Sequence, residues 1–584
     1  MLHELIHPLR LLWDGRVSFF WPIWLSITAL AAVLAVQIVP AKGITAVVSQ
    51  REGRSHRGWL NGSTLWALAL VLLFGCYVKG IVVWEDFTYY DNSHFTNETL
   101  VGRNVSLQVS PEGGRFWPLG YQEFNALRHI THSVTGYHAL RILELVVICS
   151  ILLVLDEQLS IRARVCLVCM LLITPSIVIS FGGLIYPEAN VVLLIACLVW
   201  SVQRFGRANS AVWSVAAVLF AQCLLYYKET ACLFVLGFAV GSIVLHCRND
   251  NEPSWNWKRL RDPESRLGIC LVGLAGAFVL YYFAALFPHF GARYAEDHKL
   301  PLLKVVGIYS EIDLLIVVFV IVCAVRAFLM SRGKLEPSGN WDALALGGIL
   351  YLGGYVALGM ESSYYLAPVD LIAVLYTGRV AILSLSGVGL RTKLVAVSIL
   401  LLVCTQDLAL SAFRVYERKN VVHGKALVGQ AIKDRYEHSP QSVQRLFFPF
   451  ATPFNMLEFA SYLQYIGVPV EQQTNGTGSG NAVLLIGKSI RSDGPCGYRD
   501  FLCHPGTTPD SGDLVVVLPD DISGVEEMNA YRNRSSESVL WYDPWLSVSQ
   551  SMRPIVSRLH VESPIFAFRQ LPDSWLTASV SVWR

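Results

Sequence analysis

Acidic side chains placed directly beside a long apolar run are the first residues of this sequence that could do chemistry. The run that ends near Trp84 is followed by Glu85 and Asp86, and Asp91 lies in the same polar segment. A carboxylate in such a place can take a proton from a hydroxyl group as a general base. We expect Asp86 to be this base, with Asp91 as the competing candidate and Glu85 as a neighbour that tunes the site. The alternative is that these are solvated charges that cap the run.

A second acid and a lysine stand at the ends of later apolar runs. Glu188 lies between two runs, and Lys228 and Glu229 occupy a very short turn between two others. Glu188 is either a second acid of the site or an acid in a first helical turn that stabilises the helix dipole. Lys228 either binds a phosphate group or extends to the membrane interface, with Glu229 as a simple ion partner.

Further cations could hold the same phosphate. We expect this role for Arg115, His289 and Arg293, which lie in loops, and for Arg379, which lies inside an apolar run. An arginine within such a run usually has a function or a buried partner, and Asp370 is the alternative partner for Arg379. Carboxylates and cations gathered on one side of a membrane suit the transfer of a group from a lipid phosphate.

Metal and cysteine patterns are sparse. Asp86 and Glu188 could hold Mg²⁺ or Mn²⁺, but no dense ligand pattern accompanies them, so we expect no metal and no other cofactor. Eleven of the 13 cysteines lie in or beside apolar runs, where they are expected to be buried apolar residues. Cys496 and Cys503 lie in the polar tail, and we expect them to form a disulfide.

The elements that carry these residues are predicted to be membrane-spanning helices. Hydrophobic residues make up 53% of the chain and charged residues 15%, against about 25% charged in an average soluble domain. A bilayer core of ~30 Å needs about 20 apolar residues as a helix. The fold class is therefore an α-helical polytopic membrane protein with about 11–12 transmembrane helices in residues 1–412. The expected spans are 18–39, 63–84, 138–155, 164–182, 186–203, 211–227, 230–247, 267–287, 312–331, 342–360, 367–385 and 393–412.

The loops between these runs predict how the chain is oriented. One alternating set is basic, and the opposite set is richer in acids, aromatic residues and prolines. Because basic loops stay in the cytoplasm, the loop 85–137 and the C-terminal tail are expected on the exoplasmic side of the plasma membrane. Twelve spans would also place residues 1–17 outside despite Arg10 and Arg16, so the first run could be re-entrant and leave eleven spans.

The tail, residues 413–584, has the composition of a soluble protein. A helical stretch from Arg414 to about Ser442 and an amphipathic helix ending at Gly467 precede strand-like runs at 482–490 and 513–521. We expect a soluble exoplasmic α/β domain that binds the acceptor or covers the site. The net charge of +2 gives no indication of nucleic-acid binding.

The layout of residues 60–412 resembles the GT-C superfamily of membrane glycosyltransferases. The matching segments are Trp84–Phe87 (WEDF), Gly114–Phe124 (GRFWPLGYQEF), Tyr186–Glu188 (YPE), Lys228, and Tyr364–Pro368 (YYLAP), which lacks the arginine of the family's RYLLP stretch. The resemblance implies an inverting enzyme that moves a sugar from a polyprenyl-phosphate donor to a glycan, lipid or protein acceptor. Trp117, Tyr186 and Tyr365 would then stack on sugar rings, and the alternative is that they belong to the aromatic belt of the interface.

Two other classes of protein remain open. A transporter or flippase would place its polar features near the middle of the bilayer and often contains an internal repeat. No repeat is visible, and the ionisable residues gather on one face, which favours the enzyme. A non-catalytic assembly factor for envelope polymers, with the tail as a binding module, is the third hypothesis.

Overall fold

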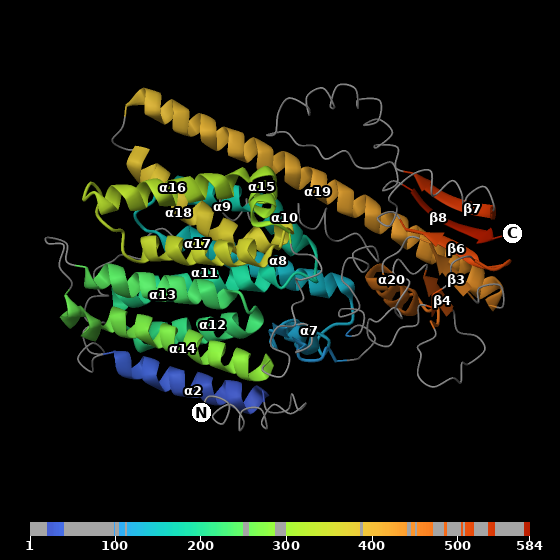
Figure 1. Cartoon of the computed structure of the whole chain (residues 1–584), viewed down its shortest axis with the longest axis horizontal. Coiled ribbons are helices and arrows are strands. Elements are labelled where there is room, and N and C mark those ends of the chain that lie inside the picture. The colour runs from blue at the N-terminus through green and yellow to red at the C-terminus, as the bar shows by residue number, and fades with distance from the viewer. Residues whose placement is uncertain are drawn as a thin grey trace, which may run out of the picture.

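The computed structural model describes residues 20–39, 99, 104–110, 114–248, 256–286, 300–385, 389–440, 445–449, 453–470, 484–487, 504–505, 509–518, 535–542 and 577–583. Helices that run side by side form a bundle, and a β-sheet lies beyond one end of it (Figure 1). The expected span 63–84 and the first part of the loop that follows it, residues 85–98 and 100–103, lie outside the described residues.

Among the described residues, eight helices are long and apolar enough to cross a membrane, or up to nine if a bent pair is one span. The eight are α2 (Phe20–Ile38), α8 (Val134–Leu155), α11 (Glu188–Ala208), α14 (Pro263–Leu286), α16 (Leu314–Ser331), α17 (Asn340–Leu358), α18 (Ala367–Leu385) and α19 (Leu390–His438). Two shorter apolar helices are α12 (Ala211–Tyr227) and α13 (Ala231–Cys247). The chain is therefore a multi-pass helical membrane protein. Each expected span that falls on described residues coincides with a helix, except the span 164–182, and the total of 11–12 spans stays a prediction.

The bent pair replaces the single helix expected over 164–182. It consists of α9 (Ile161–Leu172) and α10 (Pro175–Gly182), whose axes differ by 67°. Pro175 has no backbone N–H to donate and cannot continue a helix from the preceding turn, but it is well suited to begin a new one. The proline therefore explains the break, which sequence hydropathy alone did not reveal.

Contacts between helices fix their relative directions. The ring of Phe20 lies 5.8 Å from the ring of Tyr226, and Ser214 Oγ donates to the carbonyl oxygen of Ala35 at 2.8 Å, so α2 and α12 are antiparallel. Successive helices then alternate along the bundle. The turns that hold Glu188 and Lys228 consequently lie at the end near the sheet, and the basic loops lie at the opposite end (Figure 1).

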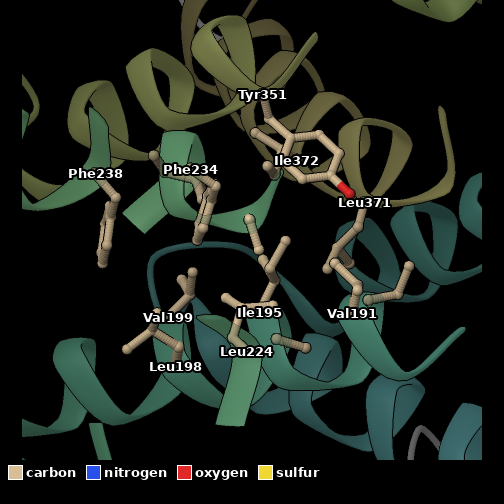
Figure 2. Close-up of a cluster of buried hydrophobic side chains, with 14 of the residues drawn as sticks. Val191, Ile195, Leu198, Val199, Leu224, Phe234, Phe238, Tyr351, Leu371 and Ile372 are labelled. Atoms are coloured by element: carbon tan, nitrogen blue, oxygen red, sulfur yellow. The ribbon is translucent and has the colours of Figure 1, made fainter. Parts of the chain in front are cut away.

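The centre of the bundle is apolar. Figure 2 shows Val191 and Ile195 of α11 facing side chains of α12, α13 and α18, among them Leu224, Phe234 and Leu371. All five are fully buried. Helices with such interiors position the residues at their ends rigidly, because close-packed cores tolerate little displacement.

Short elements cover the end of the bundle where Glu188 and Lys228 lie. They are β1 (Val109–Ser110), β2 (Arg115–Phe116), α7 (Gln122–Leu127), α15 (Leu302–Ile312) and the 3₁₀ turn η6 (Ser363–Leu366). A second 3₁₀ turn, η3 (Trp257–Arg261), precedes α14 at the other end. The segment from Arg115 to Leu127 thus corresponds to the part of the expected exoplasmic loop that lies against the bundle.

The sheet has six strands in the order β5-β4-β3-β6-β8-β7. They are β3 (Arg445–Phe448), β4 (Leu484–Gly487), β5 (His504–Pro505), β6 (Leu514–Val517), β7 (Ser535–Tyr542) and β8 (Thr577–Trp583). Strands β5, β4, β3 and β6 are parallel to one another, and β8 pairs antiparallel with both β6 and β7. The 49-residue helix α19 connects the bundle to this sheet, and α20 (Pro453–Tyr465) packs beside it (Figure 1).

The expected strands near 482–490 and 513–521 coincide with β4 and β6, and the expected helices coincide with α20 and the end of α19. Strand β3 was not predicted from the sequence. Its four residues are too few to show alternation, and tertiary pairing with β4 and β6 decides its conformation. That this part forms a separate soluble domain stays a prediction.

Candidate functional site

The segment that begins at β2 is fixed onto the end of the bundle. The buried ring of Phe116 lies 5.0 Å from the ring of Tyr281, and Leu119 N donates to the carbonyl oxygen of Tyr226 at 3.0 Å. Tyr121 has a left-handed backbone (φ 63°), and its hydroxyl donates to the carbonyl oxygen of Ile185 at 2.6 Å. These contacts hold Arg115 and Trp117 beside the ends of α11 and α12.

A buried ion pair occupies the centre of this region. Lys228 Nζ, at the C-terminal end of α12, lies 2.9 Å from Glu188 Oε1 in the first turn of α11. The side chains are 6% and 0% exposed. Lys228 therefore does not extend to the interface as a solvated cation, which was the alternative reading of its position.

The position of Glu188 is compatible with both roles considered for it. As the first residue of α11 it lies where a negative charge stabilises the helix dipole. Its Oε2 is buried and has no hydrogen-bond partner among the described residues. A buried carboxylate oxygen without a donor can accept a proton or a hydrogen bond from a ligand hydroxyl.

Two aromatic rings lie on either side of Lys228 in the sequence and against it in the fold. Its Nζ is 5.4 Å from the ring centre of Trp117 and 5.4 Å from that of Tyr365. Both distances fit cation–π attraction. The structure thus brings together Glu188, Lys228, Trp117 and Tyr365 from four separate parts of the chain.

A second ion pair adjoins the first. Arg115 Nε donates to Glu229 Oε1 at 2.6 Å, and the Arg115 guanidinium lies 5.2 Å from the ring centre of Trp117. Burial alone would raise the pKa of Glu229, but the charges of Arg115 and Lys228 outweigh it and hold that pKa below its ordinary value. Glu229 is therefore an ionised partner of Arg115, and the ion-pair partner of Lys228 is Glu188.

Tyrosine rings in contact with one another extend the aromatic surface away from Lys228. The ring centre of Tyr364 lies 4.7 Å from that of Tyr186 and 4.3 Å from that of Tyr365, with the rings tilted in both pairs. The ring of Tyr365 stacks on that of Tyr355 at 4.6 Å. The hydroxyl of Tyr355 accepts from Thr230 Oγ1 at 2.9 Å. The sequence analysis missed Tyr355, because nothing in an isolated apolar helix such as α17 indicates which tyrosine faces a site.

A polar network around Arg141 adjoins the site and connects the helices that carry it. The fully buried guanidinium donates to Glu144 at 2.8 Å and to Glu123 at 3.1 Å, and Asn190 donates to both Glu123 and the hydroxyl of Tyr227. The network joins α7, α8, α11 and α12. An Arg and a Glu three residues apart within an apolar run would have been a usable signal for it, and the sequence analysis did not use that signal.

Arg379 does not join these residues. It follows Ala367 by twelve positions on α18, which is about 18 Å along the helix. Its guanidinium donates to Asp156 at 2.8 Å and to Gln158 at 2.6 Å and lies over Trp341, at the end of the bundle with the basic loops. The placement does not fit the expected phosphate contact, and Asp370, the alternative partner, bonds Ser176 instead. Arg379 instead forms the buried pair that the sequence allowed, but with Asp156.

Several expected site residues lie outside the described residues. They are Glu85, Asp86, Asp91, His289 and Arg293, and the expected disulfide of Cys496 with Cys503 also lies there. Among the residues that the structure does describe, no group of three or more His, Cys, Asp or Glu side chains is arranged to hold a metal ion. A divalent ion shared by Asp86 and Glu188 would involve an undescribed residue.

The described residues therefore combine a buried lysine, a carboxylate with a free oxygen, an arginine and a row of aromatic rings. Such a set can hold an anion, remove a proton from a hydroxyl group and stack on an apolar ring face. No family model matches the chain, and comparisons with curated proteins and with solved structures found no match.

Proposed function

We propose that the chain is a membrane glycosyltransferase of the GT-C type. The residues around Lys228 would bind its donor at the exoplasmic leaflet. It would take a sugar from a polyprenyl-phosphate donor and transfer it to a hydroxyl group of a glycan, lipid or protein. One observation carries the proposal: Lys228 and Glu188 form a buried ion pair between the rings of Trp117 and Tyr365, beside Arg115.

The donor phosphate would be bound by Lys228 and Arg115. Each cation already has a carboxylate partner. The phosphate would either replace that carboxylate or bind the cation together with it. Binding an anion at a buried cation is favoured because the low local dielectric strengthens the attraction. Trp117 and Tyr365 would bound the sugar, since the faces of aromatic rings pack against sugar rings.

The reaction needs one base and one leaving group. The acceptor hydroxyl oxygen attacks the anomeric carbon, the bond from that carbon to the phosphate oxygen breaks, and the sugar configuration inverts. The hydroxyl proton goes to a carboxylate, for which Asp86 is the expected base and Glu188 the described one. The polyprenyl phosphate leaves with its electron pair, and Lys228 and Arg115 stabilise its charge.

Purified protein in nanodiscs, supplied with polyprenyl-phosphate hexose or pentose and an extract of membrane acceptors, tests the proposal. Lys228→Ala should lower the transfer rate by about 10²-fold or more, since a positioned charge contact to a leaving group is worth that much. Glu188→Gln should lower it as well.

Lys304 provides a matched control. It is an exposed lysine in α15, near the same end of the bundle, and Lys304→Ala should transfer at the wild-type rate. Equal rates in wild type, Lys228→Ala and Glu188→Gln would contradict the assignment. Absence of any transfer by wild type, with every sugar donor tried, would reject the enzyme.

Transport or flipping of a lipid-linked substrate is a second candidate, and a specific observation favours it. Helices α9 and α10 form a span broken by 67°, and broken spans mark substrate sites in many transporters. Movement of the lipid-linked sugar across sealed vesicles without any transfer would favour this candidate. Donor binding to the C-terminal sheet alone, with neither transfer nor movement, would favour an assembly factor.

A further inference from the structure

Three buried aspartates lie together within the bundle, apart from the residues around Lys228. Asp313 precedes α16, Asp370 lies in the first turn of α18, and Asp407 lies in α19. These residues are 1%, 0% and 1% exposed, respectively. Helices α10, α16, α18 and α19 contact one another here, so that carboxyl groups distant in sequence face one region.

Two of these carboxyl groups lie side by side. Asp313 and Asp370 are close enough to act on each other electrostatically. Asp313 Oδ1 accepts from Ile316 N at 3.3 Å, and Asp370 Oδ2 accepts from Ser176 Oγ. Their other oxygens, Asp313 Oδ2 and Asp370 Oδ1, are buried and have no hydrogen-bond donor among the described residues. Ionised carboxylates have no donor, so a proton on one of the two groups would be needed to join these oxygens.

The third carboxyl group, that of Asp407, also has an oxygen without a hydrogen-bond donor. Asp407 Oδ1 is buried and has no hydrogen-bond partner among the described residues, and the charge of Asp313 acts on Asp407. Gln406, next to it, donates to the carbonyl oxygen of Glu311 at 3.1 Å, two residues before Asp313. Asp407 thus lies against the other two through a fixed contact between α19 and the start of α16.

No cation among the described residues compensates these acids. The described ion pairs do not include Asp313, Asp370 or Asp407. Burial raises the pKa of Asp313, which lies just before the membrane-spanning segment of α16. An ionised carboxylate in an apolar interior without a partner costs several kcal/mol, and a buried acid instead takes up a proton.

Other titratable groups on the surrounding elements do not change this balance. On α9 and α19 they are the thiols of Cys166, Cys169 and Cys404, and on α15 they are Tyr309, whose hydroxyl donates to the carbonyl oxygen of Met360, and the exposed Lys304 and Glu311. Toward the other end of α16 and α18, Arg326 and Tyr376 bond Asp342, and Arg379 bonds Asp156. Helix α10 contributes the hydroxyl of Ser176 and no ionisable side chain.

We propose that Asp313, Asp370 and Asp407 form a proton-binding site that is loaded at neutral pH and that holds α19 against α10, α16 and α18. Loss of the protons would leave three carboxylates facing one another, and their repulsion would push α19 outward. Because α19 continues to the sheet (Figure 1), proton loading would also set the position of the sheet relative to the bundle. This site is independent of the proposed sugar transfer.

Infrared difference spectroscopy of the purified full chain across neutral to alkaline pH measures the proposal directly. A protonated carboxyl group has a C=O stretching band that an ionised carboxylate lacks. We expect wild type to show this band at neutral pH and to lose it as the pH rises. Asp370→Asn and Asp407→Asn should each lose part of the band at neutral pH.

Asp342→Asn is the matched control, because Asp342 is also buried in a helix but is paired with Arg326 at 2.6 Å. It should leave the band unchanged. An undiminished band in both cluster variants, or a band that titrates entirely below neutral pH, would overturn the proposal.

A second measurement needs no variant that might fail to fold. A membrane-soluble carbodiimide reacts with protonated carboxyl groups, and peptide mapping identifies the residues that it modifies. Modification of Asp370 or Asp407 in wild type at neutral pH, declining at alkaline pH, supports the site. Absence of modification at all three aspartates, with other buried acids modified, contradicts it.

Discussion

At the scale of single residues, pairing decides which charges this protein can keep in its interior. Lys228 and Glu188 compensate each other, whereas Arg379 is compensated by Asp156 at the other end of the bundle. A buried charge whose partner is removed is costly, and a pair removed together is often neutral. The two members of each pair are therefore coupled in stability even where only one of them has a chemical role.

Lys228→Met tests this coupling. It leaves the fully buried Glu188 without its cation and should lower stability by about 3–5 kcal/mol. Adding Glu188→Gln to the same chain should restore most of the lost stability, because the double variant has neither charge of this pair. The measurement is the midpoint of thermal unfolding in detergent, and transfer activity should stay absent in the double variant.

A double variant as unstable as Lys228→Met alone would mean that the two residues do not act as a pair. Recovery of both stability and sugar transfer would mean that the pair is structural only, and that the phosphate is bound elsewhere.

At the scale of elements, small residues let two central helices approach closely. Gly237 and Gly241 on α13 face Ala343 and Gly347 on α17, with the same four-residue spacing on both helices. A Cβ added at Gly347 would lie 2.9 Å from a ring atom of Phe234 and 3.0 Å from its backbone oxygen. Helices in membranes associate largely through such close packing, so this contact holds Tyr355 of α17 against the site.

Gly347→Val should therefore separate α13 from α17. Inserting bulk into a packed contact typically costs about 1–3 kcal/mol, and the thermal unfolding midpoint should fall accordingly. The control is Gly353→Val on the same helix, because a Cβ at Gly353 meets nothing within 4 Å. The two variants carry the same intrinsic helix penalty, so an equal effect would show that packing is not the cause.

At the scale of the whole molecule, function depends on which end of the bundle faces outward. The residues around Lys228 and the sheet share one end, and the basic loops share the other (Figure 1). The distribution of basic residues predicts that the first of these ends is exoplasmic. A lipid-linked donor and the acceptor would then meet on that side.

Cysteine labelling tests this orientation. Lys304 and Arg332 are exposed residues at opposite ends of the bundle, and each can be replaced by cysteine. In intact cells an impermeant maleimide should modify Lys304→Cys, whereas Arg332→Cys should react only after permeabilisation, as read by peptide mapping of the introduced cysteine. The reverse pattern would place the sheet in the cytoplasm and remove the basis for an exoplasmic enzyme.

The sequence by itself determined where most of the described membrane helices lie, although not the break between α9 and α10. An apolar run in a bilayer favours a helix, because a bilayer leaves no water to satisfy backbone polar groups. Local hydropathy carries that information, and it located α12 at residues 211–227 and α18 at residues 367–385 as the structure has them. The same one-dimensional signal placed Glu188 and Lys228 at helix ends.

Only the tertiary structure decided which side chains meet. Lys228 pairs with Glu188 and lies against Tyr365, whereas Arg379 pairs with Asp156, and Asp313 and Asp370 lie close together. These outcomes depend on how helices rotate about their axes and which neighbours they pack against. Hydropathy along a single chain does not contain that information, since it is fixed by the fit of side chains between helices.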